Sequence, residues 1–297
     1  MDPGTQRMTF AERAMPMLFV PIWATGFIVA RLIAPHAEPL TFLTVRFGLS
    51  SLAFAGLAAM AGASWPRGGR AWGKGLMAGA LMQGVYLGGV FWGVGHGVSA
   101  GMSALIVGLQ PLVTALLAAP LLGERVGPRR WIGIGLGFCG ASLVVFPKAV
   151  VTGAVPPLPL AACLVAMLGI TLGTIWQKRT AAGADPRSNA AVQFIGGALV
   201  TAPLALGLED GRFDASLTLW LALAWAVCGL SLGAVSLLLA LIRRGAVAGV
   251  ASLFYLVPPV TAVFAFALFG EALSPVQIAG MVLAALGVAL AARAQAG

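Results

Sequence analysis

The sequence predicts an all-α membrane protein with ten transmembrane helices, arranged as two inverted repeats of five helices each. Three observations lead to this prediction: the composition, the length of the apolar runs, and a match of the chain to itself at an offset of 147 residues. Sixty per cent of the 297 residues are hydrophobic and 9% are charged, whereas a soluble domain carries about 25% charged residues. Too few charges are present to cover a water-facing surface, so lipid must surround most of the chain.

The apolar runs predict helices and not a β-barrel. Inside a bilayer the backbone must satisfy its own hydrogen bonds, which leaves these two structures. Barrel strands alternate apolar and polar residues over about ten positions, but this chain has long continuous runs rich in Ala, Leu and Gly. About 20 apolar residues cross the bilayer core, and the first run is interpreted as an uncleaved helix because many further spans follow it. The predicted spans are 15–34, 39–61, 72–95, 98–122, 128–146, 157–177, 188–206, 217–242, 247–269 and 275–292.

The basic residues predict the orientation of these spans. With the amino terminus inside, 14 of the 18 Lys and Arg residues fall in cytoplasmic segments, three (Arg31, Lys148 and Arg212) fall on the opposite side, and Arg46 lies within the second span. This asymmetry is typical of membrane proteins and places both termini in the cytoplasm. The net charge of +9 is therefore interpreted as a topology signal, and no nucleic-acid partner is expected. The expected partners are the lipid bilayer and a small-molecule solute.

The internal repeat defines the two halves. Between residues 104–143 and 251–290, 15 of 40 positions are identical, where chance gives roughly a tenth in so Ala-, Leu- and Gly-rich a chain. The same offset pairs Pro39 with Pro186 and Phe47 with Phe194. We expect a first five-helix repeat over residues 1–147, a linker over 148–160 and a second repeat over 161–297. Because five is odd, the second half must enter the membrane from the opposite side, which is the architecture of alternating-access carriers.

Two segments and the opening of the chain carry a family resemblance. Residues 104–145 and 251–290 resemble the fourth and fifth, and the ninth and tenth, helices of the EamA family in the drug/metabolite transporter (DMT) superfamily, with P-x-x-T…G-E elements in both. The segments WATGFIVARL and TVRF resemble its opening helices. The resemblance implies a ten-helix basket in the inner membrane with a central cavity lined mainly by helices 1, 3, 4, 6, 8 and 9. It also implies export of small metabolites, with YddG-like amino-acid exporters, including those of aromatic amino acids, as the suspected type.

Prolines in the middle of predicted spans are the candidate hinges. A mid-helix proline frees a carbonyl and kinks the helix. Pro111 in the fourth span corresponds to Pro258 in the ninth, where Pro259 follows. Symmetry-related positions of this kind suggest hinges or broken segments beside the cavity, and a static packing kink is the alternative.

Neutral polar and aromatic residues at mid-depth are the candidate substrate ligands. An amide or a phenol in lipid needs a partner, so each is expected to face the interior of the bundle. Helix-to-helix bonding is the alternative for the two glutamines, and core packing is the alternative for Trp23 and Tyr255. Glycines at four-residue spacing, such as Gly229 and Gly233, are expected to let helices approach closely. The candidates are Trp23, Gln83, Tyr86, Gln110, Ser252 and Tyr255, with Trp176 as a candidate for an inner gate.

Charged residues in or beside the spans are interpreted as structural. Burying Arg46 costs several kcal/mol unless it is paired or hydrated, so it is expected to hold helix-end carbonyls or Glu38; facing an anionic group of the substrate is the alternative. Glu124 and Glu271 end the fourth and ninth spans at symmetry-related positions, which suits bonds to nearby loops.

The remaining residues argue against other functions. No Asp or Glu lies at the middle of a predicted span, and carriers that exchange protons for cations commonly need one there. A neutral or zwitterionic solute fits best, while a lipid or sugar-lipid flippase is the alternative carrier. The two histidines have no carboxylate cluster beside them, so neither an enzyme nor a metal site or cofactor is expected. A monomer is the expected state.

Overall fold

The structure is a computed structural model, and it describes residues 10–110, 113, 117, 128–151, 156–180, 184–237, 257–270 and 273–293. Within these residues all regular secondary structure is helical, which confirms the all-α part of the predicted fold class, and one isolated β-bridge joins two loops. In the described part of the chain, five helices are long and apolar enough to cross a membrane: Pro39–Met60, Gly69–Gly95, Pro157–Gln177, Pro186–Leu208 and Leu217–Leu237. Four shorter apolar helices accompany them. The count of ten spans stays a prediction.

The first half of the chain forms helices whose ends follow from local sequence. Pro39 stands in the first helical turn, where its missing N–H has no helical partner to lose. The Ser99 hydroxyl accepts a hydrogen bond from the Met102 N–H at 3.3 Å and caps the next helix. Gly97, with φ of +108°, ends the helix before it. The segments are α1 (Phe10–Ile33), α2 (Pro39–Met60), α3 (Gly69–Gly79), η1 (Ala80–Val85), α4 (Tyr86–Gly95), α5 (Ala100–Val107) and α7 (Pro128–Val151).

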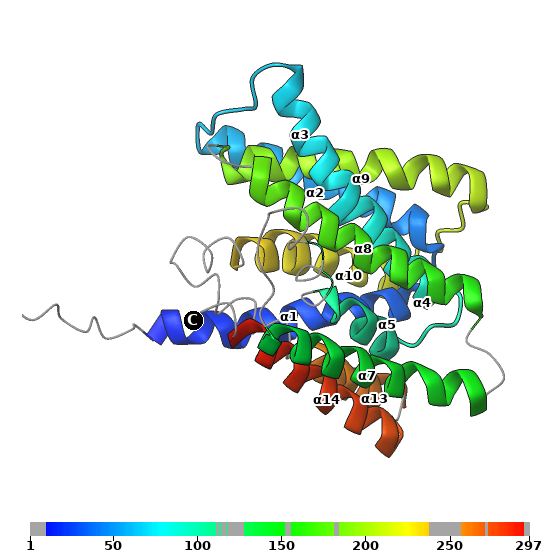
Figure 1. The fold of residues 1–297 in the computed structure, drawn as a ribbon. Coiled ribbons are helices and arrows are strands. Elements are labelled where there is room, and N and C mark those ends of the chain that lie inside the picture. The colour runs from blue at the N-terminus through cyan, green and yellow to red at the C-terminus, as the bar shows by residue number, and fades with distance from the viewer. Residues whose placement is uncertain are drawn as a thin grey trace, which may run out of the picture.

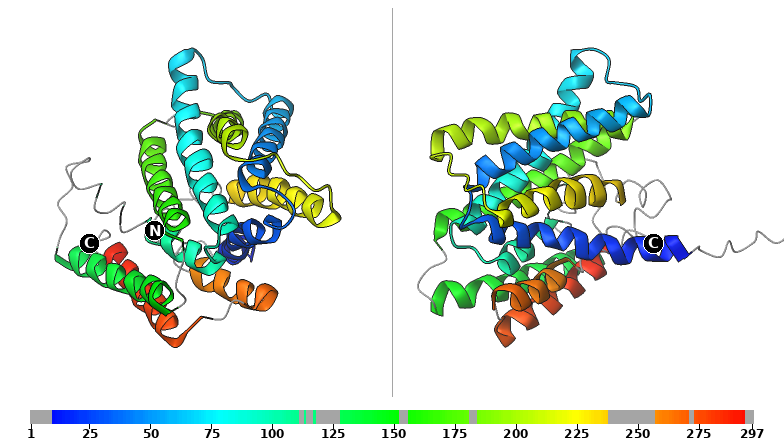
Figure 2. Two further views of the ribbon diagram at one scale, coloured as in Figure 1. Left: turned by 90° about the vertical axis from the view of Figure 1, so that its right-hand side faces the viewer. Right: turned by 180° about the vertical axis from the view of Figure 1, so that it is seen from behind.

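The second half follows the same rules. Asp185 accepts a hydrogen bond from the Arg187 N–H at 2.9 Å, and Ser216 accepts one from Leu219 at 3.2 Å, so each caps the helix that it precedes. Gly270, with φ of +67°, ends another helix. The segments are α8 (Pro157–Thr180), α9 (Pro186–Leu208), α10 (Leu217–Trp225), η2 (Ala226–Ala234), α13 (Val257–Phe269) and α14 (Pro275–Arg293). Figures 1 and 2 show most of these helices lying alongside one another, with α7 and α14 together at one side.

Some helices end elsewhere than predicted. α7 continues through Pro147 to Val151, and α8 begins at Pro157, so helix occupies most of the segment predicted as a linker. Transmembrane helices tolerate an internal proline when neighbouring groups satisfy the freed carbonyl. In the predicted fourth span, the described helix α5 ends at Val107, and a turn occupies residues 108–109.

The offset of 147 residues recurs in the helix boundaries. α2 begins at Pro39 and α9 at Pro186, which are 147 residues apart. Both η1 and η2 are π-helical, and 80–85 plus 147 gives 227–232, which lies inside η2. Segments of π-helix are rare and concentrate at functional sites. The same irregularity therefore stands at corresponding places in both halves.

Corresponding helices also pack against each other in antiparallel fashion. A Cβ added at Gly140 of α7 would lie 2.6 Å from the Gly280 carbonyl oxygen, and one added at Gly287 of α14 would lie 2.6 Å from that of Gly133. Gly133 corresponds to Gly280, and Gly140 to Gly287, so the contact maps onto itself when the halves are exchanged. In the α2–α9 pair the corresponding rings of Phe47 and Phe194 lie 5.9 Å apart.

Helices approach each other closely at most of the glycine pairs with four-residue spacing. A Cβ at Gly79 would overlap the backbone carbonyl of Gln193 on α9, and a Cβ at Gly93 would lie 2.6 Å from the Cys163 sulfur on α8. The expectation is wrong for Gly229 and Gly233, because the atoms nearest to a Cβ there belong to their own helix. These two glycines instead lie in η2, where the backbone is already π-helical.

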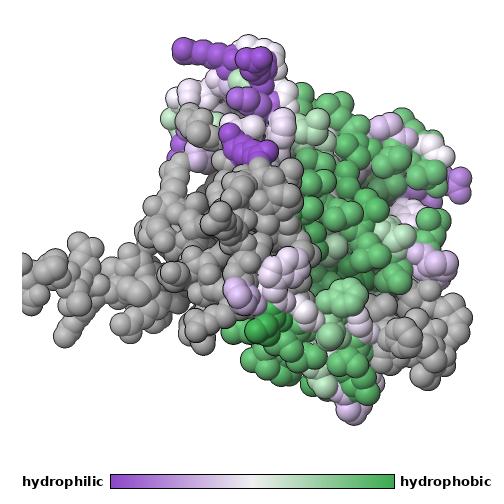
Figure 3. All heavy atoms as spheres, viewed as in Figure 1, coloured by the Kyte–Doolittle hydropathy of each residue, from purple (hydrophilic) through white to green (hydrophobic). Residues whose placement is uncertain are grey.

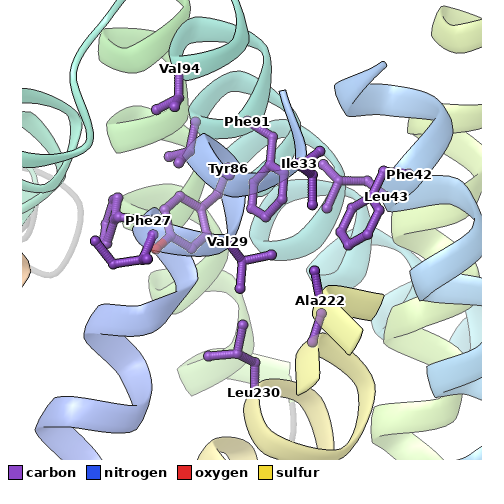
Figure 4. Close-up of a cluster of buried hydrophobic side chains, with 14 of the residues drawn as sticks. Phe27, Val29, Ile33, Phe42, Leu43, Tyr86, Phe91, Val94, Ala222 and Leu230 are labelled. Carbon is purple, nitrogen blue, oxygen red and sulfur yellow. The ribbon is translucent and has the colours of Figure 1, made fainter. Parts of the chain in front are cut away.

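Aromatic and aliphatic side chains fill the centre of the bundle. Figure 4 shows Phe42 and Phe91 close together and Phe27 beside Tyr86, with Leu230 approaching from η2. The Phe42 and Phe91 rings stack at 6.0 Å between centroids. Outside, apolar side chains cover a broad belt, and hydrophilic residues gather around the α2–α3 connection (Figure 3). An apolar exterior of this kind is what a lipid environment requires.

Candidate functional site

A central cavity lies among α1, α2, η1, α4, α8, α9 and η2. Its volume of about 70 Å³ has room for about five water molecules. Most of the wall is apolar, and the polar groups are few. We call this space the central cavity; it is lined by Trp23, Gly26, Phe27, Arg46, Met82, Gln83, Tyr86, Leu87, Val90, Phe91, Ile170, Phe194, Leu230, Ser231 and Val235.

Arg46 is the charged group of the central cavity among the residues that the structure describes. It lies two turns inside α2 and is 4% exposed. Its Nη2 donates a hydrogen bond to the Ser231 hydroxyl at 3.3 Å, while Nε and Nη1 have no partner among the described residues. The expected pairing with Glu38 is not what the structure has, because Glu38 stands at the N-cap of α2 and accepts a hydrogen bond from the Arg212 N–H at 2.9 Å.

Ser231 holds a defined position in the π-helical segment η2. Its hydroxyl donates to the Ala226 carbonyl five residues earlier at 3.1 Å, so its oxygen is free to accept from Arg46. Ser231 is not among the candidates predicted from the sequence. The repeat offset offered a signal, since Ser231 corresponds to Gly84, the neighbour of the candidate Gln83. The apolar wall residues Phe27 and Leu230 were missed because nothing distinguishes them from ordinary core residues.

Three of the aromatic and amide candidates meet at the central cavity. Trp23 comes from α1, Gln83 from η1 and Tyr86 from the first turn of α4. Tyr86 is 5% exposed, and the Trp23 ring lies 5.3 Å from that of Phe19. The sequence therefore identified residues that the fold brings together from separate helices.

A smaller side cavity of about 20 Å³ lies next to the central one and shares Trp23 and Tyr86 with it. Gln110 and Pro258 line this side cavity, together with residues of α5 and α13. The Gln110 side-chain amide also lies 3.5 Å from the Thr174 hydroxyl on α8. Gln110 thus combines contact between helices with a place at a cavity wall.

The other candidates lie elsewhere. Trp176 is 36% exposed, and its indole N–H donates to the Lys74 carbonyl at 3.0 Å, so it lines none of these cavities. Its neighbour Gln177 lines a more polar cavity of about 260 Å³, together with Lys74 and Asp185. Pro259 lies within helix α13. Five candidates fall outside the described residues: Pro111, Ser252, Tyr255, Glu124 and Glu271.

Two loops bond to each other where α1 and α9 end, and we call this contact the loop junction. Ala37 and Phe213 form the β-bridge. The Glu209 carboxylate accepts hydrogen bonds from the Leu40 and Thr41 N–H groups, at 2.8 and 2.7 Å, at the first turn of α2. Figure 1 shows both loops at the end of the bundle opposite the α2–α3 connection. Backbone and carboxylate hydrogen bonds thereby join the two loops at one end of the bundle.

Glu38 carries a shifted pKa in this junction. Desolvation by burial raises it, but hydrogen bonds from backbone N–H groups of the opposing loop and the positive charge of Arg212 outweigh that effect. The pKa of Glu38 is therefore below its ordinary value of 4.5.

In the described lining of the central cavity, acidic and metal-binding groups do not gather. Among the residues described, no three His, Cys, Asp or Glu side chains lie close enough to hold a metal ion. The described lining of the central cavity has one basic residue and no acidic one. The arrangement suits binding and release of a small organic molecule.

Comparison with known proteins identifies relatives of the whole chain. A sequence model of the EamA-like transporter family matches residues 14–146 and again residues 158–293. A WAT1-related chloroplastic protein of Arabidopsis thaliana is 24% identical over 270 residues, which cover 87% of this chain and 64% of that protein. The chain thus spans less than two thirds of that relative's length.

The fold has a counterpart among solved structures. A crystal structure superposes with a TM-score of 0.66 over 93% of this chain and 94% of its own, at 18% sequence identity. At that identity the likeness concerns the fold alone. The double match of the family model and the apolar exterior of the helices identify a multi-pass membrane protein.

Proposed function

Because the chain belongs to the EamA-like transporter family, whose members are transporters and not enzymes, we propose that it is a secondary transporter for small neutral or zwitterionic metabolites. Amino acids, including aromatic ones, are the proposed substrates, as in the YddG-like exporters that the sequence resembles. The proposed direction is export across the inner membrane, with both termini in the cytoplasm. The distribution of Lys and Arg supports this orientation.

The central cavity is the observation that carries the proposal. It lies inside the bundle, it has room for about five water molecules, and its wall combines apolar rings with an indole, a phenol, an amide and one guanidinium. Ligand sites in proteins typically join an apolar lining to a few placed polar groups. A small organic solute with a polar end matches this composition.

The symmetry of the helices supports alternating access. The antiparallel α7–α14 and α2–α9 pairs suit two halves that rock against each other around a site between them. Two π-helical segments, η1 and η2, contribute residues to the central cavity from corresponding positions. The loop junction joins two loops at one end of the bundle, while the polar cavity beside Lys74 and Gln177 lies toward the other end. We propose that access to the central cavity alternates between these two ends during transport.

Counterflow in proteoliposomes tests the transport proposal. Vesicles that contain purified protein and an unlabelled amino acid should accumulate the labelled amino acid transiently, while empty vesicles should not. Exchange of a different metabolite class, with none for amino acids, would overturn the amino-acid assignment and leave the family function intact. Movement of labelled lipid head groups in place of soluble solutes would favour a flippase.

Trp23 offers a test of the site itself. Trp23→Ala removes a ring from the cavity wall and is expected to weaken substrate binding about tenfold, for a loss of roughly 1.4 kcal/mol of contact. Trp131→Ala is the matched control, because Trp131 is 53% exposed on the outer surface and lines none of the cavities. Equal affinity of the two variants would remove Trp23 from the proposed site. Tyr255→Ala, a candidate from sequence alone, is expected to behave as Trp23→Ala does.

A further inference from the structure

The guanidinium of Arg46 is buried with unused donors. A guanidinium carries five N–H donors in a planar fork, and the hydrogen bond to Ser231 occupies one of them. The Nε and Nη1 atoms are buried and have no partner among the residues described. Buried donors of this kind are costly to leave unmade, so these atoms are available to a ligand in the central cavity.

Among the residues that the structure describes, no opposite charge lies beside Arg46. Ser231 is a neutral acceptor, and the described lining of the central cavity includes no Asp or Glu. Glu38 and Glu209, at the ends of α2 and α9, are both engaged at the loop junction. Asp185, at the other end of α9, accepts a hydrogen bond from the Arg187 N–H. An isolated buried cation favours binding of an anion. A carboxylate fits best, because its two oxygens match the guanidinium fork.

The rest of the central cavity limits the ligand further. A single cation does not balance a phosphate or a dicarboxylate, while the rings of Phe27 and Phe91 and the side chain of Leu230 form an apolar wall. An ammonium group would find neutral oxygens such as the amide of Gln83, but no carboxylate among the described lining residues. The cavity therefore recognises a negative end and an apolar body, and it contributes little toward a positive group.

Building on the proposed transport function, we propose that Arg46 is the carboxylate anchor of the central cavity and that the cavity selects compact organic monocarboxylates with an apolar body. Amino acids belong to this class through their carboxylate, and their ammonium group is not required. Ser231 is a positioning residue that holds one edge of the guanidinium. The open edge, with Nε and Nη1, is left to the ligand.

Three compounds with one carbon skeleton test this selectivity on the unmodified protein. Valine has both charges, 3-methylbutanoate keeps only the carboxylate, and valinamide keeps only the ammonium. Thermal stabilisation of the purified protein at neutral pH measures binding of each. Valine and 3-methylbutanoate should bind within a few-fold of each other, and valinamide about tenfold or more weaker. Equal or tighter binding of valinamide, or no binding of either carboxylate, would overturn the proposal.

Variants connect the selectivity to Arg46. Arg46→Gln should abolish the preference for 3-methylbutanoate over valinamide, and Arg46→Lys, which keeps the charge without the fork, should retain part of it. Arg70→Gln is the matched control, because Arg70 is exposed in the first turn of α3, and it should bind as the unmodified protein does. If Arg46→Gln does not fold, Ser231→Ala serves instead, and it should preserve the preference for carboxylates. An unchanged preference in folded Arg46→Gln, or its loss in Ser231→Ala, would contradict the assignment.

The outcomes separate this inference from the transport proposal. Amino-acid counterflow together with tight binding of valinamide would leave the transporter and remove the anchor. Binding of 3-methylbutanoate without any amino-acid counterflow would keep the anchor and remove amino acids as transported substrates.

Discussion

The glycine contact between α7 and α14 allows a sharp test of the packing. A Cβ added at Gly140 would meet the Ala284 N–H group and lie 2.6 Å from the Gly280 carbonyl oxygen, whereas a Cβ added at Gly135 on the same helix meets nothing within 4 Å. Each Gly→Ala change gains about 1 kcal/mol of helix propensity. At Gly140 the two backbones must also separate, and overpacking of this kind costs about 1–3 kcal/mol.

We therefore expect Gly135→Ala and Gly140→Ala to change the stability of the protein in opposite directions. Gly135→Ala should stabilise the protein by up to about 1 kcal/mol, and Gly140→Ala should be less stable than Gly135→Ala by about 1–3 kcal/mol. Gly287→Ala should behave as Gly140→Ala does, because its Cβ would meet the α7 backbone in the corresponding way. Thermal unfolding in detergent ranks the three. If Gly140→Ala were as stable as Gly135→Ala, α7 and α14 would not be in backbone contact, and the antiparallel pairing would be refuted.

Three further predictions concern the loop junction and the hinge. Glu209→Gln should weaken the charge-assisted hydrogen bonds to the first turn of α2 and lower the stability measured by thermal unfolding by about 1–3 kcal/mol. Asp210→Asn changes an exposed neighbour and should lower stability little. Equal effects of the two variants would refute the role of Glu209 as a cap of α2. Because the pKa of Glu38 is lowered in the folded protein, its carboxylate should stabilise the junction above pH 4.5 and lose that effect as the pH falls through the folded pKa. Glu38→Gln should flatten this part of the profile of stability against pH. A profile identical to that of the unmodified protein would contradict the assignment. Pro258→Ala should lower turnover and change labelling of the cavity from either side if Pro258 is a hinge, while unchanged turnover and accessibility would indicate a static kink.

The sequence by itself was sufficient for the class of fold and for part of the site. Apolar runs of about 20 residues require helices because lipid offers no partners to the backbone, and the predicted starts at Pro39 and Pro157 agree with those of α2 and α8. Trp23, Gln83 and Tyr86 were identified because a polar or amphipathic group in a lipid-exposed helix is unfavourable, which predicts that it faces inward. Both predictions depend only on the local sequence and on the lipid around it.

The tertiary structure determined which groups the residues of the candidate site contact. The partner of Arg46 is Ser231, 185 positions away on a π-helical turn, and no pattern in either segment encodes that distance. The expected span length also placed a helix end at Pro147, but the helix continues past this residue. Neighbouring helices can satisfy a freed carbonyl that an isolated helix cannot. Burial, pairing and the shape of a cavity depend on contacts between distant segments, and only the packed bundle determines those contacts.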